Sequence, residues 1–331
     1  MGAACSMIPD VTVGPVTTSG RRYVVTGGAG FIGHHSVAAL LAEGGQVLVL
    51  DDLRHACPAG APAEAELVVA EVSSPEAAAA IARFKPDAVL HLAAQAGVNR
   101  SRRDPAGDAR ANVVGTVGLV RSCLDAGVDR FVMASTGGAI YGRAVQLPTP
   151  ETAAAQPLSP YGAAKLACEV YLGMFERSHV LRPLVLRYGN VYGPLQDGTG
   201  EAGLVAITCT RLLAGQRPVI RGDGGQTRDF VYVGDVAEAN LRAVDSGASG
   251  VANIGTGEGS SVRSVVEGLI AASGLAVEPE LAPLPEGEVR DSRLDVTLAG
   301  TLLGWKPNLN LAEGLARTYT SIAAAGDREE I

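Results

Sequence analysis

Tyr161 stands four residues before Lys165, in a segment that begins with Ser159 and Pro160. On a helix this spacing places the phenol and the ammonium group on one face. A phenol with its ordinary pKa of about 10 is a poor base at neutral pH. A nearby ammonium favours the phenolate and lowers that pKa. The pair therefore predicts acid–base chemistry, with Lys165 also able to hold a ribose. An exposed Tyr and Lys on a solvated helix is the alternative.

A glycine-rich turn lies far upstream of this pair. Gly27, Gly30 and Gly33 follow the apolar run Tyr23–Val25 and open a stretch with helical character. Glycines in this arrangement allow a tight turn and let the backbone approach a pyrophosphate, which the N-terminus of the helix then binds. A turn without any ligand is the alternative interpretation. Together with Tyr161 and Lys165, the turn predicts a nucleotide cofactor beside an acid–base group.

The end of the second apolar run indicates which dinucleotide binds. Asp51 stands where a carboxylate accepts both hydroxyls of the adenosine ribose. Asp52 follows and would repel a 2′-phosphate, and Arg54 is the only cation close in sequence. We therefore predict NAD rather than NADP. A carboxylate that merely closes the turn after a strand is the alternative for Asp51.

Two hydroxyl groups, Ser135 and Thr136, follow the apolar run Arg130–Ala134. In a doubly wound fold, ligands lie beyond the carboxyl ends of the strands. A hydroxyl at this place can bridge the phenol of Tyr161 and a hydroxyl of a sugar. The alternative role for both residues is capping of a turn.

The pattern of elements that must position these residues is an alternation of short apolar runs with helical stretches. Such alternation predicts an α/β protein with a Rossmann-type, doubly wound parallel sheet and a smaller C-terminal α/β substrate lobe. The expected strands are 22–25, 46–50, 66–70, 88–92, 130–134 and 184–188. The expected helices are 30–43, 75–84, 105–126, 158–177 and 311–325.

Three regions divide the chain. Residues 1–20 are expected to form a flexible extension, residues 21–190 the NAD-binding Rossmann domain, and residues 191–331 mainly the substrate-binding lobe. Two later segments, 230–233 and 251–254, have the apolar character of strands that return to the main sheet. The charged tail after residue 326 is expected to fray.

Composition excludes several classes of protein. The chain has 331 residues, 47% of them hydrophobic, and a formal charge of −8, which argues against nucleic acid as a partner. The apolar runs are too short for a membrane span, and the N-terminus shows no secretory signal. The five cysteines are far apart, without C-x-x-C spacing, and are expected to be free thiols in a cytoplasmic protein without a metal site: Cys5, Cys57, Cys123, Cys168 and Cys209.

These motifs, in this order, resemble the extended short-chain dehydrogenase/reductase superfamily, in particular its NAD-dependent nucleotide-sugar epimerases and dehydratases. The resemblance covers nearly the whole chain after residue 20. The segments that carry it are 50–53, 91–98, 112–116, 186–194 and 227–236. Within the superfamily, residues 135–142 and 200–207 look most like prokaryotic UDP-glucose 4-epimerases.

The resemblance implies roles for individual residues. Catalysis would fall to Tyr161, Lys165 and Thr136. The implied cofactor-binding residues, besides Tyr161 and Lys165, are Gly27, Gly30, Phe31, Ile32, Asp51, Asp52, Val72, Leu92, Ala93, Ala94, Asn112, Ser135 and Tyr188. The implied residues for the nucleotide-diphosphate sugar are Thr136, Asn190, Leu204, Arg228 and Arg290. Arginine suits this task because its planar fork matches phosphate geometry. A surface or bridging ion pair is the alternative for each arginine.

Two positions depart from the pattern that the resemblance implies. Glu71 precedes Val72 where an aspartate is usual, so a contact with adenine is weakened or redirected. Gly137 stands where the catalytic Ser or Thr is usual, and Thr136 is the nearest hydroxyl. We therefore expect either that Thr136 substitutes for the missing group or that Tyr161 takes the sugar proton directly.

The leading functional prediction is an NAD-dependent UDP-hexose 4-epimerase that works through a transient 4-keto sugar and forms a homodimer. A nucleotide-sugar 4,6-dehydratase would need an added acid and base, which Gly137 and Gly138 cannot supply. A decarboxylase and a uronic-acid or 3,5-epimerase stay open. A catalytically silent NAD-binding protein is the alternative from another class, and the presence of both Tyr161 and Lys165 argues against it.

Overall fold

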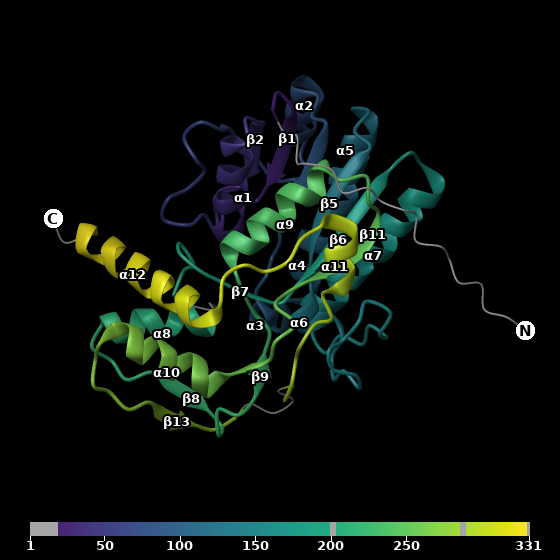
Figure 1. Ribbon diagram of the computed structural model, residues 1–331. Helices are drawn as coiled ribbons and strands as arrows, with labels where there is room; N and C mark the ends of the chain where they lie inside the picture. The colour runs from purple at the N-terminus through teal and green to yellow at the C-terminus, as the bar shows by residue number, and fades with distance from the viewer. Residues whose placement is uncertain (1–18, 199–202, 285–288, 330–331) are drawn as a thin grey trace, which may run out of the picture.

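The computed structural model of the chain describes residues 19–198, 203–284 and 289–329 (Figure 1). Nearly all of the predicted N-terminal extension, and the last two residues of the tail, lie outside these ranges. The final helix continues to Glu329, beyond the predicted end at residue 325.

A seven-stranded, wholly parallel sheet forms the centre of the described chain (Figure 1). Its strand order is β11-β6-β5-β4-β1-β2-β3. This is the predicted Rossmann-type, doubly wound arrangement, in which the order reverses between β1 and β4. The strands are β1 (Arg22–Thr26), β2 (Gln46–Asp51), β3 (Glu66–Val69), β4 (Ala88–His91), β5 (Arg130–Thr136), β6 (Arg182–Tyr188) and β11 (Gly250–Ile254).

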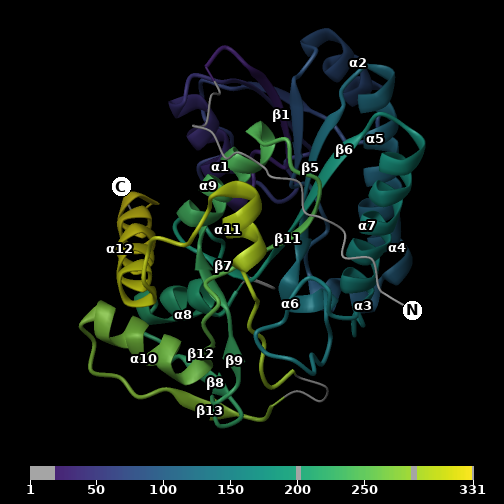
Figure 2. The same cartoon turned by 45° about the vertical axis from the view of Figure 1, so that its right-hand side comes forward.

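Helices cover both faces of this sheet (Figure 2). Successive residues of β1 show the reason, because Tyr23 and Val25 enter one apolar core and Val24 enters the other. One face packs against α1 (Phe31–Ala42), α9 (Val233–Asp245) and α11 (Thr297–Leu303). The opposite face packs against α2 (Pro75–Phe84), α5 (Gly115–Asp125) and α7 (Pro160–Ser178). Burial on both faces explains the continuous apolar runs of the strands.

The long helix predicted from residue 105 to residue 126 is not one regular helix. It consists of α4 (Pro105–Ala109), a π-helical turn η1 (Arg110–Val114) and α5. Short π-helical turns often occur at functional sites, and this one carries the predicted residue Asn112. A further short helix, α3 (Val98–Arg103), precedes α4, and α6 (Gly137–Ile140) follows β5.

The second half of the chain adds a smaller lobe with its own apolar core (Figures 1 and 2). Its helices are α8 (Leu204–Leu213), α10 (Val262–Ser273) and α12 (Leu311–Glu329). Its strand pairs are β7 (Asn190–Tyr192) with β10 (Phe230–Tyr232), β8 (Val219–Arg221) with β13 (Glu280–Ala282), and β9 (Thr227–Arg228) with β12 (Ser260–Ser261).

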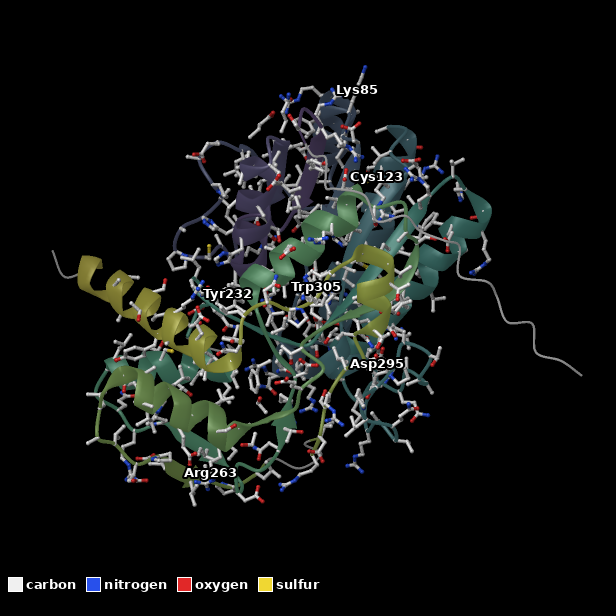
Figure 3. All side chains as sticks on the ribbon, in the orientation of Figure 1. Lys85, Cys123, Tyr232, Arg263, Asp295 and Trp305 are labelled. Carbon is white, nitrogen blue, oxygen red and sulfur yellow. The ribbon has the colours of Figure 1, made fainter. Side chains whose placement is uncertain are left out.

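The two segments expected to return to the main sheet behave differently. Residues 251–254 do so, because β11 pairs with β6 at the sheet edge. For residues 230–233 the expectation is wrong, since β10 pairs with β7 instead. Trp305, near the centre of Figure 3, packs in the same apolar core as α9 and α11, and its indole Nε1 donates to the Asp235 carbonyl of α9 at 2.9 Å.

The described chain agrees with two expectations from composition. Cys57, Cys123, Cys168 and Cys209 are all free thiols and buried, whereas Cys5 lies outside the described residues. Within the described ranges, no helix has both the length and the apolar character needed to cross a membrane.

Candidate active site

The glycine turn between β1 and α1 has the geometry that a pyrophosphate site requires. Gly27 has a φ of +70°, and a Cβ there would lie 2.7 Å from the backbone nitrogen of Ala93. A Cβ on Gly33 would lie 2.0 Å from the carbonyl oxygen of Gly27. Gly30 begins α1 without a side chain that caps the helix. The N-terminus of the helix is therefore open to an anion.

A buried histidine, His91, supports this turn through contacts with two threonine hydroxyls. The imidazole of His91 lies between two threonine hydroxyls, 2.7 Å from Thr26 Oγ1 and 2.9 Å from Thr116 Oγ1. Thr26 Oγ1 in turn accepts a hydrogen bond of 3.2 Å from the backbone N–H of Ala93. Burial lowers the pKa of His91 to about 3, and the charge of Lys165 adds to the effect. The histidine is therefore a neutral brace for the ends of β1 and β4.

A cavity of about 530 Å³ opens beside the turn. Asp51, at the end of β2, lies on its wall and is almost fully buried, with its carboxylate accepting from the N–H groups of Ala29 at 3.0 Å and Leu53 at 2.8 Å. The predicted cofactor residues that line the cavity are Gly27, Gly30, Asp51, Asp52, Val72, Leu92, Ala93 and Ala94. They come from the ends of β1, β2, β3 and β4, so the fold joins segments that are separate in sequence.

Cations around the cavity are more numerous than the sequence interpretation assumed. Arg54 was taken as the only cation nearby, but Arg100 and Arg110 also line the wall. The guanidinium of Arg100 lies 2.9 Å from the imidazole of His55. Sequence reasoning missed Arg100 and Arg110 because α3 and η1 lie far along the chain from Arg54 and reach the cavity wall only in the folded protein.

Asn112 braces the loop after β4 and does not line the cavity. Its amide nitrogen donates to the Gln95 carbonyl at 3.0 Å, and its amide oxygen accepts from the Gln95 N–H at 2.9 Å. The same amide nitrogen donates to Asp108 at 3.1 Å. Asp108 lines the cavity, is buried and has a pKa raised by that burial. Sequence reasoning missed it, although its spacing of four from Asn112 on a helix was the available signal.

Tyr161 and Lys165 lie in the first turns of α7, which Ser159 caps through the N–H of Gly162. The backbone N–H of Tyr161 donates to the Ser101 hydroxyl of α3 at 3.2 Å, and this bond connects α7 to α3 beside the cavity. The Lys165 ammonium is buried and donates to the Ala134 carbonyl of β5 at 2.9 Å. Lys165 is thereby held at the carboxyl end of β5.

The predicted effect of Lys165 on the phenol is wrong for the chain by itself. Burial raises the pKa of Tyr161, and the nearby carboxylate of Asp108 adds to the rise. Burial also lowers the pKa of Lys165. Desolvation outweighs attraction here because both groups lie in a poorly solvated place. Tyr161 is therefore protonated at neutral pH, and activation must come from what binds beside it.

Ser135 is turned away from the cavity and into a buried polar network. Its hydroxyl donates to Glu169 of α7 at 2.5 Å, and Glu169 forms a buried ion pair of 2.6 Å with Arg187 of β6. Arg187 also donates to the Tyr141 hydroxyl at 2.8 Å, and that hydroxyl donates to Asn253 at 2.8 Å. The network ties the end of β5 to its neighbours, and it uses the one hydrogen that the Ser135 hydroxyl can donate, so the predicted contact with the cofactor would have Ser135 as acceptor.

Steric contacts explain why glycine stands at position 137. A Cβ on Gly137 would lie 2.6 and 2.7 Å from the two Cδ atoms of Leu294, which is buried against Ile140 and Tyr141. At the next position, a Cβ on Gly138 would lie 3.5 Å from Asn190 Oδ1 and 4.0 Å from Thr136 Oγ1. The side chains of Thr136 and Asn190, both predicted to bind substrate, therefore both lie next to Gly138.

The two predicted diphosphate-binding arginines lie close together in the lobe. Arg228 Nη1 donates to the Thr227 carbonyl at 2.7 Å and to the Arg290 carbonyl at 3.4 Å. The exposed guanidinium of Arg290 holds Asp223 through hydrogen bonds of 2.9 and 3.1 Å. That contact lowers the pKa of Asp223 to about 2. Leu204 begins α8 and packs on the core of the lobe.

Asp229 organises this part of the lobe, although sequence reasoning gave it no role. Its buried carboxylate accepts from the N–H of Thr256 at 2.7 Å, the hydroxyl of Thr256 at 2.8 Å, and the N–H groups of Gly257 at 3.1 Å and Leu294 at 3.2 Å. It therefore fixes Leu294 over Gly137. An acidic residue directly before the apolar run Phe230–Tyr232 was the signal that could have revealed it.

Tyr188 has its hydroxyl engaged as well, through donation to Asn240 at 2.6 Å. Its pKa is raised, chiefly by burial and also by the neighbouring Tyr161. A contact of Tyr188 with the cofactor thus falls to its ring. Phe31 and Ile32 begin α1, next to Gly30. Gly200, Glu201 and Ala202 of the segment compared with the 4-epimerases lie outside the described residues.

Comparison with known proteins identifies the family. The model of the NAD dependent epimerase/dehydratase family matches residues 23–255. The chain belongs to this family. Its cofactor is NAD, and the open helix terminus, the glycine contacts and the Asp51 carboxylate all fit that dinucleotide.

Individual relatives are similar over almost their whole length. The UDP-glucose 4-epimerase of Mycolicibacterium smegmatis is 44% identical over 303 residues, which cover 90% of this chain and 97% of the relative. A UDP-glucose 4-epimerase of Thermotoga maritima, solved with UDP-glucose, shares 44% identity with a TM-score of 0.89, covering 92% of this chain and 99% of that chain. The NAD complex of the Thermus thermophilus enzyme shares 41% identity with a TM-score of 0.86, over 92% and 99% of the two chains.

Proposed function

We propose that this protein is a UDP-glucose 4-epimerase, which interconverts UDP-glucose and UDP-galactose through a 4-keto sugar. The observation that carries the proposal is the joining of an NAD cavity, through α3 and the loop that Asn112 braces, to Tyr161 and the buried Lys165. The similarity to proteins named UDP-glucose 4-epimerase supports the same sugar.

In the proposed mechanism, Tyr161 removes the proton of the sugar 4-hydroxyl and returns it after the sugar has turned. When bound, NAD supplies the hydride acceptor at C4 and the source of the returned hydride. Lys165, anchored on the Ala134 carbonyl, holds the nicotinamide ribose. Thr136 hydrogen-bonds the sugar hydroxyl in place of the side chain that Gly137 lacks.

Substrate anchoring falls to residues from both halves of the chain. The side chains of Asn190 and Thr136 both lie next to Gly138, where the sugar would bind. Arg228 and Arg290 would bind the diphosphate, and Leu204 would flank the nucleotide. A sugar held by its diphosphate can expose either face of C4 to the same hydride donor, which is what epimerisation requires.

A 4,6-dehydratase is disfavoured by the segment after β5. Elimination of water needs an additional acid and base, and Gly137 and Gly138 have no side chains that transfer protons. Tyr161 and Lys165 are both held in place on α7 beside the cavity, which disfavours a silent NAD-binding protein. Uronic-acid epimerases, 3,5-epimerases and decarboxylases form other products. Identification of the product therefore distinguishes each of them from the proposed 4-epimerase.

The deciding experiment is incubation of the purified protein with UDP-galactose and with other nucleotide sugars, followed by identification of the products by NMR. Formation of UDP-glucose from UDP-galactose is expected, at an equilibrium reached from either side. A dehydrated, decarboxylated or 3,5-inverted product, or turnover that survives Tyr161→Phe, would contradict the proposal.

We also propose a homodimer and a cytoplasmic location. The outer face of α7 exposes Val170, Tyr171 and Met174, and Val114 of η1 is exposed beside it in the same helical layer. An apolar helical face of this kind suits packing against a second copy. Free cysteines are usual in the reducing cytoplasm. Sedimentation of the wild type and of Val170→Lys tests the assembly, since the variant should shift the protein to monomer.

A further inference from the structure

Three charged side chains meet where β2 and β3 end, at the edge of the cofactor cavity. The guanidinium of Arg54 contacts the carboxylate of Glu71, and its Nε lies 3.5 Å from Asp52 Oδ2. All three side chains line the cavity. Asp51 and Val69 are partners in the parallel register, so the segments that follow the two strands leave the sheet side by side. Arg54 is therefore held between two carboxylates of the cavity wall.

The backbone after β2 directs Arg54 to this place. Leu53 has a φ of +61°, a left-handed conformation that is rare outside glycine. Its N–H donates to Asp51 Oδ1 at 2.8 Å, and the N–H of Arg54 donates to Asp52 Oδ1 at 3.0 Å. These bonds close a tight turn on the carboxylate predicted to hold the adenosine ribose. Arg54 therefore leaves the turn beside the ribose position.

A guanidinium at this point of a dinucleotide fold is the group that accommodates a 2′-phosphate. Phosphate is bound best when the arginine can offer its donors in parallel pairs. Here Glu71 and Asp52 engage the donors of Arg54 and add two negative charges where the phosphate would lie. Arg100, a second guanidinium of the wall, lies against His55.

We propose that Glu71 is a cofactor-specificity residue, which sequesters Arg54 and thereby excludes the 2′-phosphorylated dinucleotide. Asp51 selects for the ribose hydroxyls, and Glu71 prevents the neighbouring guanidinium of Arg54 from binding a 2′-phosphate. The longer side chain of glutamate serves this role because it reaches from the end of β3 across to Arg54. The inference rests on the NAD site and not on the sugar that the protein converts.

Glu71→Gln tests the proposal, because it retains the length of the side chain and removes its charge. Calorimetric titration of the wild type and the variant with NAD and with NADP gives the ratio of the two dissociation constants. We expect that ratio to shift about tenfold toward NADP, the scale of one charge-assisted hydrogen bond between the released Arg54 guanidinium and the 2′-phosphate. Glu66→Gln is the matched control, because Glu66 of β3 pairs with Arg83 at the same sequence separation and does not line the cavity.

A second variant assigns the effect to the arginine. Glu71→Gln combined with Arg54→Ala should lose the gain in NADP binding, because no sequestered cation is left to release. An unchanged ratio in Glu71→Gln would overturn the proposal, and so would a gain that persists without Arg54. The titrations use no sugar, so failure of the proposed epimerase activity would not change how they are interpreted.

Discussion

The cofactor end of the site, from the glycine turn to Asp51, is built differently from its catalytic end at Thr136, Tyr161 and Lys165. The cofactor end is formed mostly by backbone, and close approaches of atoms around Gly27 and Gly33 leave no room for a Cβ. The catalytic end is formed by side chains held through polar contacts between distant segments, such as Asp229 with Leu294 and Glu169 with Arg187.

This difference predicts how substitutions at each end of the site affect binding, stability and turnover. A turn shaped by backbone tolerates almost no added atoms, so only glycine fits at Gly27 and Gly33. An end held by side chains can lose one group and keep its shape, because the other contacts remain. We therefore expect substitutions at the cofactor end to affect binding and stability together, and substitutions at the catalytic end to separate turnover from binding.

The largest effect is expected for Gly33→Ala. The new Cβ would lie 2.0 Å from the Gly27 carbonyl, so either the turn or α1 must move. We expect loss of NAD binding and a fall of more than about 4 kcal/mol in the free energy of unfolding, by the scale of severe backbone clashes. Denaturant unfolding and NAD titration measure both. Gly247→Ala is the control, because a Cβ there meets nothing within 4 Å; equal behaviour of the two variants would contradict the comparison.

Tyr161→Phe should separate chemistry from binding at the catalytic end. Loss of the phenolic hydroxyl is expected to lower turnover by about 10²-fold or more, the usual scale for a general acid–base group. NAD affinity should change far less, because Tyr161 does not line the cavity. Tyr171→Phe, on the exposed face of the same helix, is the matched control. Near-normal epimerisation by Tyr161→Phe would show that another group is the base.

Thr136→Val tests the hydroxyl that would stand in for the one absent at position 137. Valine has nearly the same shape without the hydroxyl, and we expect the barrier to rise by about 3 kcal/mol, toward the lower end for a lost catalytic hydrogen bond. Ser135→Ala should cost less turnover, because its hydroxyl bonds Glu169 in the buried network. Steady-state kinetics on UDP-galactose compare the two variants. Full activity of Thr136→Val would indicate that Tyr161 contacts the sugar hydroxyl directly.

Gly137→Ser probes the packing that links the lobe to β5. The added atoms would press on the Leu294 side chain, and overpacking of this kind costs about 1–3 kcal/mol of stability. Leu294→Ala removes the obstructing Cδ atoms, so the double variant should be more stable than the sum of the two single effects predicts. Urea unfolding of the four proteins measures this coupling. Additive effects would mean that the two side chains do not compete for space.

The smallest effect is a pH dependence of stability from His91. Its pKa is lowered to about 3 by burial, so the folded protein holds it neutral while the unfolded chain protonates it below about 6.5. Stability from this group is therefore complete above pH 6.5 and falls with decreasing pH, by about 1.4 kcal/mol at pH 5.5. His91→Gln should flatten that part of the urea-unfolding profile, whereas exposed His179→Gln should not. A slope that both variants retain would assign it to other groups.

The sequence predicted the cofactor end well because the features that build it are local. The turn Gly27–Gly33 is contiguous, and Asp51 ends the next strand, so periodicity and glycine spacing suffice. The predictions that failed depend on neighbours that are distant in sequence. Arg100 reaches the cavity across the sheet, Phe230–Tyr232 finds β7 instead of the main sheet, and the Tyr161 pKa follows desolvation more than the nearby ammonium.

By itself, the sequence determined the parallel α/β class, the dinucleotide turn and the placement of Tyr161 and Lys165 at the start of one helix, since each follows from spacing within one or two elements. Only the tertiary structure decided that Ser135 points into the Glu169–Arg187 network, that Leu294 fills the space beside Gly137, and that Glu71 engages Arg54. The physical reason is that packing and desolvation depend on all atoms within a few ångströms. The chain brings those atoms together from positions that no local pattern relates.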